Sequence, residues 1–211
     1  MDLNNYIFFF ILFLISFFFT KYLNLFLKKI DHKLLIDDQF TKPQAFHEYP
    51  VSTIGGLCTY LSFLVVYFYI FFFENINHFE YFSFCSLIFF LGFIDDIKIR
   101  FNPNIRLLLM IFLLLFLINF NNFYVEKTGI GFINELLENS KIFSIAFVCI
   151  CFLFIINGAN LIDGYNGLLG IHSLIIITNL FFINYIGGNY ELSYLLFSFI
   201  IILLVFLLFN F

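Results

Sequence analysis

Long apolar runs alternate with short polar segments along the chain, and this pattern predicts a series of membrane-spanning helices. A helix needs about 20 apolar residues to cross the hydrocarbon core of a bilayer. Seven runs approach that length: Tyr6–Leu27, Ile54–Phe73, Phe79–Ile94, Ile105–Phe120, Ile142–Ile156, Leu168–Ile186 and Leu192–Phe211. The third, fourth and fifth are short and need flanking polar residues drawn into the interface. The first is too long, and lacks the small-residue cleavage site, to be a removed signal peptide, so we expect it to remain a spanning helix.

The composition supports a membrane protein and excludes a soluble one. Hydrophobic residues make up 63% of the 211 residues and charged residues 11%, against about 45–50% and about 25% in soluble domains. We therefore expect an all-α, polytopic transmembrane bundle that forms a single integral membrane domain over residues 1–211. The four cysteines lie inside apolar runs and are interpreted as buried free thiols rather than metal or redox groups. A net charge of −4 suggests no nucleic-acid partner.

The positions of the basic residues predict the orientation. The connections after the first, third and fifth spans, with the mouth of the fourth span, hold seven of the ten: Lys28, Lys29, Lys33, Lys42, Lys98, Arg100 and Arg106. The opposite set holds only Lys127 and Lys141, and Lys21 lies inside the first span. The positive-inside rule then places the first set in the cytoplasm and the N-terminus outside. On the outer side, Ile130–Leu137 is apolar enough to lie at the membrane interface.

Three polar segments on the predicted cytoplasmic side carry the candidate chemistry. In the first, two prolines and the pair Gly55-Gly56 predict a rigid approach to a helix, and His47 by itself is more often a solvated loop histidine than a ligand. In the second, Asp95 and Asp96 end an apolar run, where neighbouring carboxylates repel and desolvation is costly. Lys98 can neutralise one of them, and a divalent cation with polyphosphate can neutralise both. A plain charge cluster at a helix end is the alternative.

The third segment places oxygen-bearing side chains at every third residue: Asn157, Asn160, Asp163 and Asn166. This spacing puts them near one face of a helical turn, although Gly164 and Gly167 interrupt a regular helix. The set suits a hard cation or the hydroxyls and base of a sugar nucleotide, and a hydrophilic turn is the alternative. Because of the parity of the spans, we expect all three segments to meet on one membrane face, where they would form a site for phosphoryl chemistry between a soluble donor and a lipid acceptor.

These motifs resemble, in order, spacing and topology, those of the polyprenyl-phosphate N-acetylhexosamine-1-phosphate transferases (glycosyl transferase family 4). This family includes the phospho-MurNAc-pentapeptide translocase and the enzymes that initiate O-antigen. The residues that carry the resemblance, over essentially the whole chain, are His47…Pro50…Gly55-Gly56, Gly92-Phe-Ile-Asp95-Asp96 and Asn157-x-x-Asn160-x-x-Asp163-Gly164-x-Asn166-Gly167-Leu168.

The resemblance implies transfer of a sugar-1-phosphate from a UDP-sugar to polyprenyl (undecaprenyl) phosphate, with Mg²⁺ or alternatively Mn²⁺, at the cytoplasmic face of the cell (inner) membrane. Such a reaction initiates cell-wall or lipopolysaccharide O-antigen synthesis. The family's catalytic positions match Asp95, Asp96 and Asp163, of which the first two are tied to the lipid phosphate. Asn160 and Asp163 match positions near the metal and the nucleotide. The candidate substrate-binding residues are His47, Lys98, Arg106, Asn157 and Asn166.

The chain departs from the family pattern at three places. Ala45 stands where a basic residue is usual, and Asn166 stands where many members have Asp. The chain also stops at Phe209-Asn210-Phe211, which resembles the lead-in to a Gly-Asp-x-Gly-Ser segment that supplies a principal Mg²⁺ aspartate in the family. We therefore expect these residues to be the N-terminal two-thirds of the family fold, with little turnover by themselves.

Two other classes of function compete with this interpretation. A non-catalytic, degraded paralogue would bind polyprenyl phosphate or a full-length enzyme without transferring sugar phosphate, and association as a homodimer is left open. A channel or transporter would place polar residues near the middle of its spans. The interior of each span is almost wholly apolar, so this class ranks low.

The parity of the spans predicts that Asp96 and Asp163 reach the same cytoplasmic surface. In a variant without its native cysteines, Asp96→Cys and Asp163→Cys should react with a membrane-impermeant maleimide only after the membrane is opened. Glu74→Cys, in the predicted outer turn after the second span, should react in intact cells and serves as the control. External labelling of Asp163→Cys alone would separate the third segment from the acidic pair and remove the common site.

Overall fold

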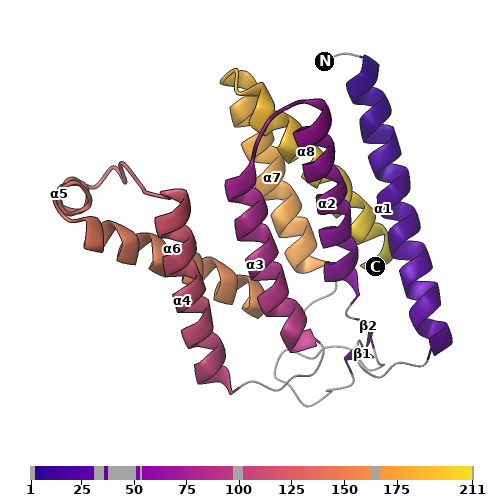
Figure 1. Cartoon of the computed structure of the whole chain (residues 1–211), viewed down its shortest axis with the longest axis horizontal. Coiled ribbons are helices and arrows are strands. Elements are labelled where there is room, and N and C mark those ends of the chain that lie inside the picture. The colour runs from indigo at the N-terminus through magenta and orange to yellow at the C-terminus, as the bar shows by residue number, and fades with distance from the viewer. Residues whose placement is uncertain are drawn as a thin grey trace. The chain divides into compact units, whose positions relative to one another are not determined.

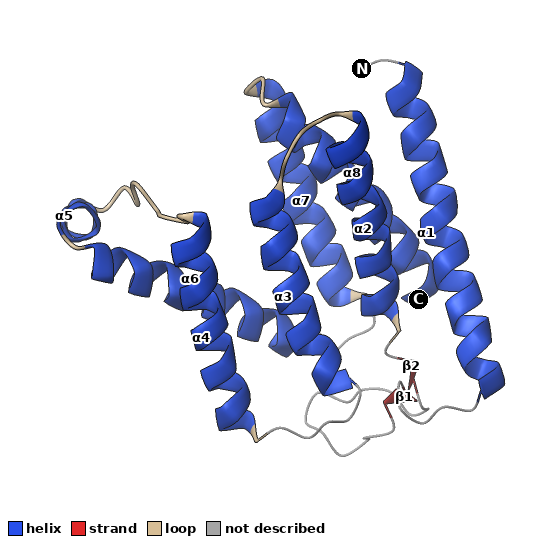
Figure 2. Ribbon diagram, in the orientation of Figure 1, coloured by secondary structure: helices blue, strands red, loops and turns tan. Residues whose placement is uncertain are grey.

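The computed structural model describes residues 3–30, 36–37, 51–52, 54–96, 102–162 and 167–210, and these are almost entirely helical (Figure 2). The side chains of some residues at the element ends, Asp95 and Asp96 among them, lie outside the description. The helices are α1 (Leu3–Ile30), α2 (Gly55–Phe73), α3 (Phe79–Asp96), α4 (Pro103–Asn121), α5 (Gly131–Asn139), α6 (Lys141–Ile162), α7 (Leu168–Ile186) and α8 (Tyr190–Asn210). The expected all-helical, polytopic fold is confirmed.

Six of these helices are long and apolar enough to cross a membrane: α1, α2, α4, α6, α7 and α8. The apolar part of α3, Phe79–Ile94, is shorter. Helix α6 runs to Ile162, six residues past the predicted end at Ile156. The reason is local, because the Asn157 side-chain amide donates a hydrogen bond to the Leu153 carbonyl at 2.8 Å, which accommodates a polar residue inside the helix. The first polar residue, Asn157, therefore shows where the apolar run ends, whereas the helix continues beyond it.

A short antiparallel strand pair, which the sequence pattern did not predict, lies in the connection between α1 and α2. Strand β1 (Ile36–Asp37) pairs with β2 (Val51–Ser52), and Ile36 lies opposite Ser52.

The chain divides into two compact units. The first comprises residues 1–79, 96–98 and 162–211, and the second comprises residues 80–95 and 99–161. The expectation of a single domain over the whole chain stays a prediction.

In the first unit, aromatic contacts indicate the relative directions of α1, α2 and α8 (Figure 1). The Phe8 ring of α1 stacks on Tyr69, near the end of α2, with ring centroids 3.8 Å apart, so α1 and α2 are antiparallel. Phe8 also lies 5.7 Å from Tyr194 at the start of α8, and Phe17 lies 5.2 Å from Phe209 at its end. Helices α1 and α8 are therefore parallel, as expected of a first and a seventh span.

The core of the first unit lies between α1, α2 and α8. Leu12 and Val66 are its most deeply buried members, and Ile70, Leu195 and Ile202 complete it around Phe8 and Phe9. Helix α7 packs along α8. Most of α7 is exposed, as expected of a helix whose apolar side chains are solvated by lipid instead of water.

In the second unit, α3, α4 and α6 share a smaller core around Leu114, Ile118, Val148 and Cys149. The Phe84 ring of α3 lies 4.6 Å from the Phe152 ring of α6. Figure 1 shows α6 crossing α4 steeply instead of running beside it. The short helix α5 lies between these two helices in sequence.

Candidate active site

One side chain joins three helix ends in the first unit, where α2 and α7 begin and α8 ends. A Cβ atom added at Gly55 would lie 2.6 Å from Cε2 of Phe206. One added at Gly170 would lie 3.3 Å from Cε1 of the same ring and 2.7 Å from Cδ2 of Leu207. Helices α2 and α7 thus approach the end of α8 closely. A larger residue at either glycine would push against the Phe206 ring, and at Gly170 also against Leu207. We call Gly55, Gly170, Phe206 and Leu207 the glycine rim.

The glycine rim brings together parts of the chain that are far apart in sequence. Helix α2 follows the first polar segment, and α7 follows the third, so the two segments lead to neighbouring helix ends. This arrangement supports the expectation that they meet on one membrane face. Sequence reasoning missed Phe206, and no signal could have found it, because it is one of 38 phenylalanines and lies in a continuous apolar run.

The first turns of α2 and α7 both lie at the glycine rim, and neither helix is preceded by a capping side chain. The preceding residues are Ile54 and Gly167, which carry no polar side-chain group. Gly167 is buried and has a φ of +75°, a conformation that suits glycine. Unpaired N–H groups and the helix dipole give a helix start a partial positive charge, which attracts anions. The glycine rim therefore combines two such helix starts.

The acidic pair is described by its backbone alone. Asp95 and Asp96 are the last two residues of α3, and the last turn contains no basic residue. Two carboxylates there oppose the negative end of the helix dipole, which makes the position locally unfavourable by about 0.3–1 kcal/mol for each charge. The helix itself therefore gives no reason for the pair, whereas a cationic partner would.

Arg106 lies in the first turn of α4, half-buried, and its backbone N–H donates to the Asn102 carbonyl at 3.1 Å. Figure 1 shows the end of α3 and the start of α4 at the same end of the second unit. Arg106 and the end of α3 thus share that end.

The two described members of the third motif lie near the end of α6. Asn157 is half-buried and Asn160 is exposed. The structure confirms that both are helical, and a separation of three residues places them near one face. Asn157 uses its side-chain N–H for the bond to Leu153, whereas the exposed Asn160 amide is accessible from outside the helix.

The remaining candidates, His47, Lys98, Asp163 and Asn166, lie outside the described residues. Their roles, and those of the Asp95 and Asp96 side chains, stay predictions. Among the side chains that the structure describes, no three His, Cys, Asp or Glu residues gather as a metal site would require.

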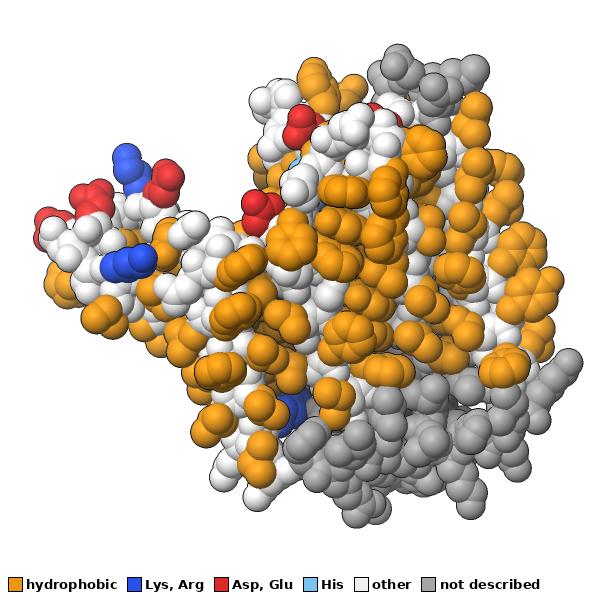
Figure 3. Space-filling view, in the orientation of Figure 1, with side chains coloured by type: hydrophobic (Ala, Val, Ile, Leu, Met, Phe, Trp, Pro, Cys, Tyr) orange, Lys and Arg blue, Asp and Glu red, His pale blue; other side chains and the backbone are white. Residues whose placement is uncertain are grey.

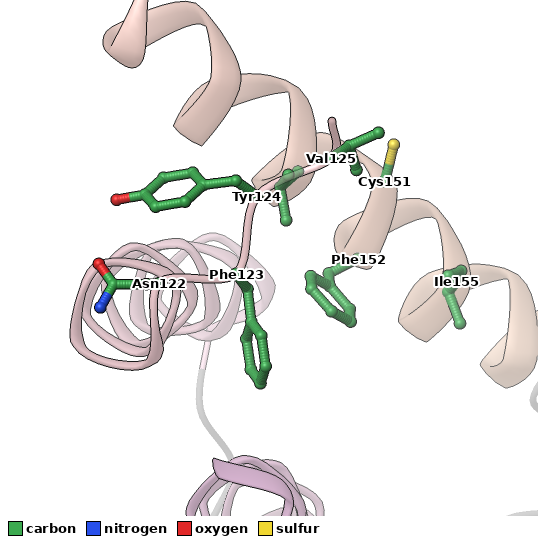
Figure 4. A pocket seen from close by; sticks show the side chains of 8 residues that line it. Asn122, Phe123, Tyr124, Val125, Cys151, Phe152 and Ile155 are labelled. Atoms are coloured by element: carbon green, nitrogen blue, oxygen red, sulfur yellow. The ribbon is translucent and has the colours of Figure 1, made fainter. Parts of the chain in front are cut away.

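A hollow of about 320 Å³ lies in the second unit, between α6 and the loop that follows α4 (Figure 4). Its walls include Phe123, Val125, Phe152 and Ile155, and none of the candidate site residues lines it. Asn122 and Tyr124 extend their polar ends away from Phe152 and Ile155. The hollow is apolar and lies at the opposite end of α4 from Arg106, so it offers no phosphate site.

Comparison with known protein families gives one match. The model of the family described as glycosyl transferase family 4 matches residues 78–211, which is more than half of the chain. The chain belongs to glycosyl transferase family 4. No curated protein and no solved structure matches it significantly.

The match begins at His78, one residue before α3, and covers α3 to α8. It includes every candidate site residue except His47. The resemblance of the first segment thus stays a prediction, while that of the second and third lies inside the match. As a member of glycosyl transferase family 4 with six candidate spans, the protein is a multi-pass membrane protein of a transferase family.

The glycine rim predicts a sharp contrast between two adjacent glycines. Gly55→Ala should destabilise the protein by about 1–3 kcal/mol because the new methyl group overlaps the Phe206 ring. Gly56→Ala should be neutral or stabilising by up to about 1 kcal/mol, since nothing lies within 4 Å of the added atom and alanine favours a helix. Thermal unfolding in detergent, followed by size-exclusion chromatography, compares the two.

A second substitution tests the cause of that contrast. Adding Phe206→Leu to Gly55→Ala should recover part of the lost stability, because the smaller side chain makes room for the methyl group. Equal melting temperatures for Gly55→Ala, Gly56→Ala and the unaltered protein would contradict the close approach at the glycine rim.

Proposed function

We propose that the protein transfers an N-acetylhexosamine-1-phosphate from a UDP-sugar to polyprenyl (undecaprenyl) phosphate at the cytoplasmic face of the cell membrane, initiating an envelope glycan of the O-antigen or cell-wall type. Membership of glycosyl transferase family 4 supports the reaction class. The geometric observation that carries the proposal is the pair of uncapped helix starts, α2 and α7, at the glycine rim.

The two helix starts suit a diphosphate, because its negative charge is matched by the partial positive charge of each helix. A UDP-sugar offers a diphosphate between nucleoside and sugar. The α7 start directly follows the third motif, so Asp163 and Asn166 precede in sequence the helix that would hold the phosphates.

In the proposed reaction, an oxygen of the lipid phosphate attacks the β-phosphorus of the UDP-sugar. A new P–O bond forms to the lipid phosphate, the bond between the β-phosphorus and the bridging oxygen breaks, and UMP leaves with that oxygen. Asp95 or Asp96 holds the lipid phosphate in line and accepts its proton where it is protonated. Lys98 and Arg106 balance charge on the phosphate oxygens.

The donor set of the third motif fits a hard divalent cation. Carboxylate and amide oxygens are ligands that Mg²⁺ accepts, usually with water and substrate phosphates completing the set. Asp163 and the exposed Asn160 amide would hold it. Such an ion would neutralise charge on the diphosphate during the transfer.

Removing either carboxylate should abolish most of the turnover. Asp95→Asn and Asp163→Asn are each made in the protein together with any residues encoded after codon 211. With undecaprenyl phosphate and UDP-GlcNAc as substrates, each variant should release UMP more slowly by about 100-fold or more. Glu191→Gln is the matched control, because Glu191 lies in the first turn of α8, at the other end of that helix from Phe206.

The three variants must also insert into membranes equally, as judged by the amount extracted in detergent. Wild-type rates in Asp95→Asn or Asp163→Asn would remove that residue from the chemistry. Binding of polyprenyl phosphate with no UMP release from the unaltered protein would favour the degraded-paralogue alternative.

Metal removal provides an independent test. Chelation with EDTA should stop UMP release, and excess Mg²⁺ should restore it, with Mn²⁺ as a partial substitute. Titration of Mg²⁺ with Asn160→Ala should require a higher concentration for half-maximal rate, whereas Asn179→Ala, in the middle of α7, should leave that concentration unchanged. Turnover that persists in EDTA would contradict the proposed role of the metal.

A further inference from the structure

Helix α5 separates apolar from polar side chains more completely than the spanning helices do. Its apolar residues are Phe132, Ile133, Leu136 and Leu137, and its polar ones are Asn134, Glu135, Glu138 and Asn139. At 100° per residue the four apolar residues share one face and the four polar residues share the other. A helix of this kind needs an apolar medium on one side and water on the other.

Only part of the apolar face is covered by the protein. Leu137 is 7% exposed, whereas Phe132 is 72% exposed. The apolar residues that flank the helix are also open, with Ile130 at 56% and Ile142 at 82% exposure. The side chains of Ile130, Phe132 and Ile142, which we call the apolar edge, are thus available to another medium.

The connection to α6 determines what that medium is. Helix α5 ends at Asn139, and α6, a candidate membrane span, begins at Lys141. Ser140, the one residue between them, accepts a hydrogen bond on its hydroxyl from the Phe143 N–H at 3.2 Å and so caps α6. The end of α5 is therefore held at the boundary of a candidate membrane span, which brings lipid within reach of its exposed apolar side chains.

The direction of α5 also fits a membrane surface. Figure 1 shows α5 end-on, while α4 and α6 both run in the plane of the picture. Helix α5 therefore runs along neither of the two helices that flank it. A helix that turns away from the spans on both sides of it suits a position along the membrane surface.

The loop that precedes α5 is tied to it. The Asn134 side-chain oxygen accepts hydrogen bonds from the Thr128 N–H at 2.8 Å and from the Thr128 hydroxyl at 2.9 Å. Lys141 lies 5.8 Å from the centre of the Tyr124 ring, within reach of a cation–π interaction. Figure 3 shows that the charged side chains of this part of the molecule gather on one side of it, with hydrophobic side chains below them.

We propose that α5 is a monotopic anchor that lies in the interface of the lipid leaflet at the start of α6, predicted to be the outer leaflet, with the apolar edge among the acyl chains. Glu135 and Glu138 then face water. Because the polar face of α5 is acidic and contains no Lys or Arg, the anchor is held by burial of apolar side chains and not by anionic lipid head groups.

The sequence contains no tryptophan, which allows a direct test. Phe132→Trp and Glu138→Trp each introduce a single tryptophan, the first on the apolar face of α5 and the second on its polar face, about 120° away around the helix. The full chain is reconstituted in phosphatidylcholine vesicles, with and without acyl chains brominated near the head group. Phe112→Trp, on an exposed position of α4 within the bilayer span, serves as the lipid-exposed reference.

The expected result is a clear separation of the two faces. Phe132→Trp should show blue-shifted emission and lose most of it to brominated lipid, with little loss to aqueous acrylamide. Glu138→Trp should show the reverse. Replacing part of the phosphatidylcholine by phosphatidylglycerol should change neither result.

Three outcomes would overturn the proposal. Equal quenching of both tryptophans by acrylamide would place the apolar edge in water. Protection of Phe132→Trp from both acrylamide and brominated lipid would show that a protein covers it. Quenching by brominated lipid only in phosphatidylglycerol vesicles would show electrostatic binding. Far-UV circular dichroism equal to that of the unaltered protein shows that each variant is folded.

Discussion

The structure depends on the requirement that polar groups inside a bilayer find partners within the chain. An unsatisfied backbone group in hydrocarbon costs several kcal/mol, so spanning segments become helices. Their polar side chains obey the same requirement. Asn179 and Asn184 in α7 donate to carbonyl groups four residues earlier at 2.8 Å, as does the Ser62 hydroxyl in α2 at 2.9 Å. These residues can remain in apolar helices because each returns its hydrogen bond to its own backbone.

This requirement explains why the candidate chemistry lies at helix ends. A carboxylate cannot be satisfied by the carbonyl four residues earlier, because both groups only accept hydrogen bonds. Charged groups must therefore reach the membrane boundary or bind a cation. The acidic pair that ends α3 and the asparagines that end α6 lie where these helices leave their apolar runs. Within the first unit, the two helix starts at the glycine rim favour negative charge. The residues proposed to bind a diphosphate and its metal therefore lie at helix ends, because charged groups are costly inside the hydrocarbon region.

Sequence reasoning captured the helices well and their contacts hardly at all. The length of the apolar runs located all six helices that are long enough to span a membrane, and also the shorter α3. Helix α7 has the predicted bounds Leu168–Ile186, because a turn glycine precedes it and a glycine pair follows it. The end of α6 was missed because Asn157 is polar yet helical. The β1–β2 pair was missed because two-residue strands have no periodicity. The approach of Phe206 to Gly55 and Gly170 depends on packing of helices far apart in sequence, and uniform apolar runs contain no register information that would reveal it.

Polar residues in the predicted outer connection serve a different purpose from those on the predicted inner side. Asn134 bonds Thr128, Ser140 caps α6, and the Asn121 side-chain amide donates to the Ser83 hydroxyl at 3.2 Å. These groups satisfy one another and fix a fold in which α5 turns its apolar edge outward. On the predicted inner side, the acidic pair of α3 opposes its own helix dipole, and two helix starts have no side-chain cap. Local stabilisation explains the first set and fails to explain the second, and that difference is the physical reason for assigning anchorage to one side of the membrane and phosphoryl transfer to the other.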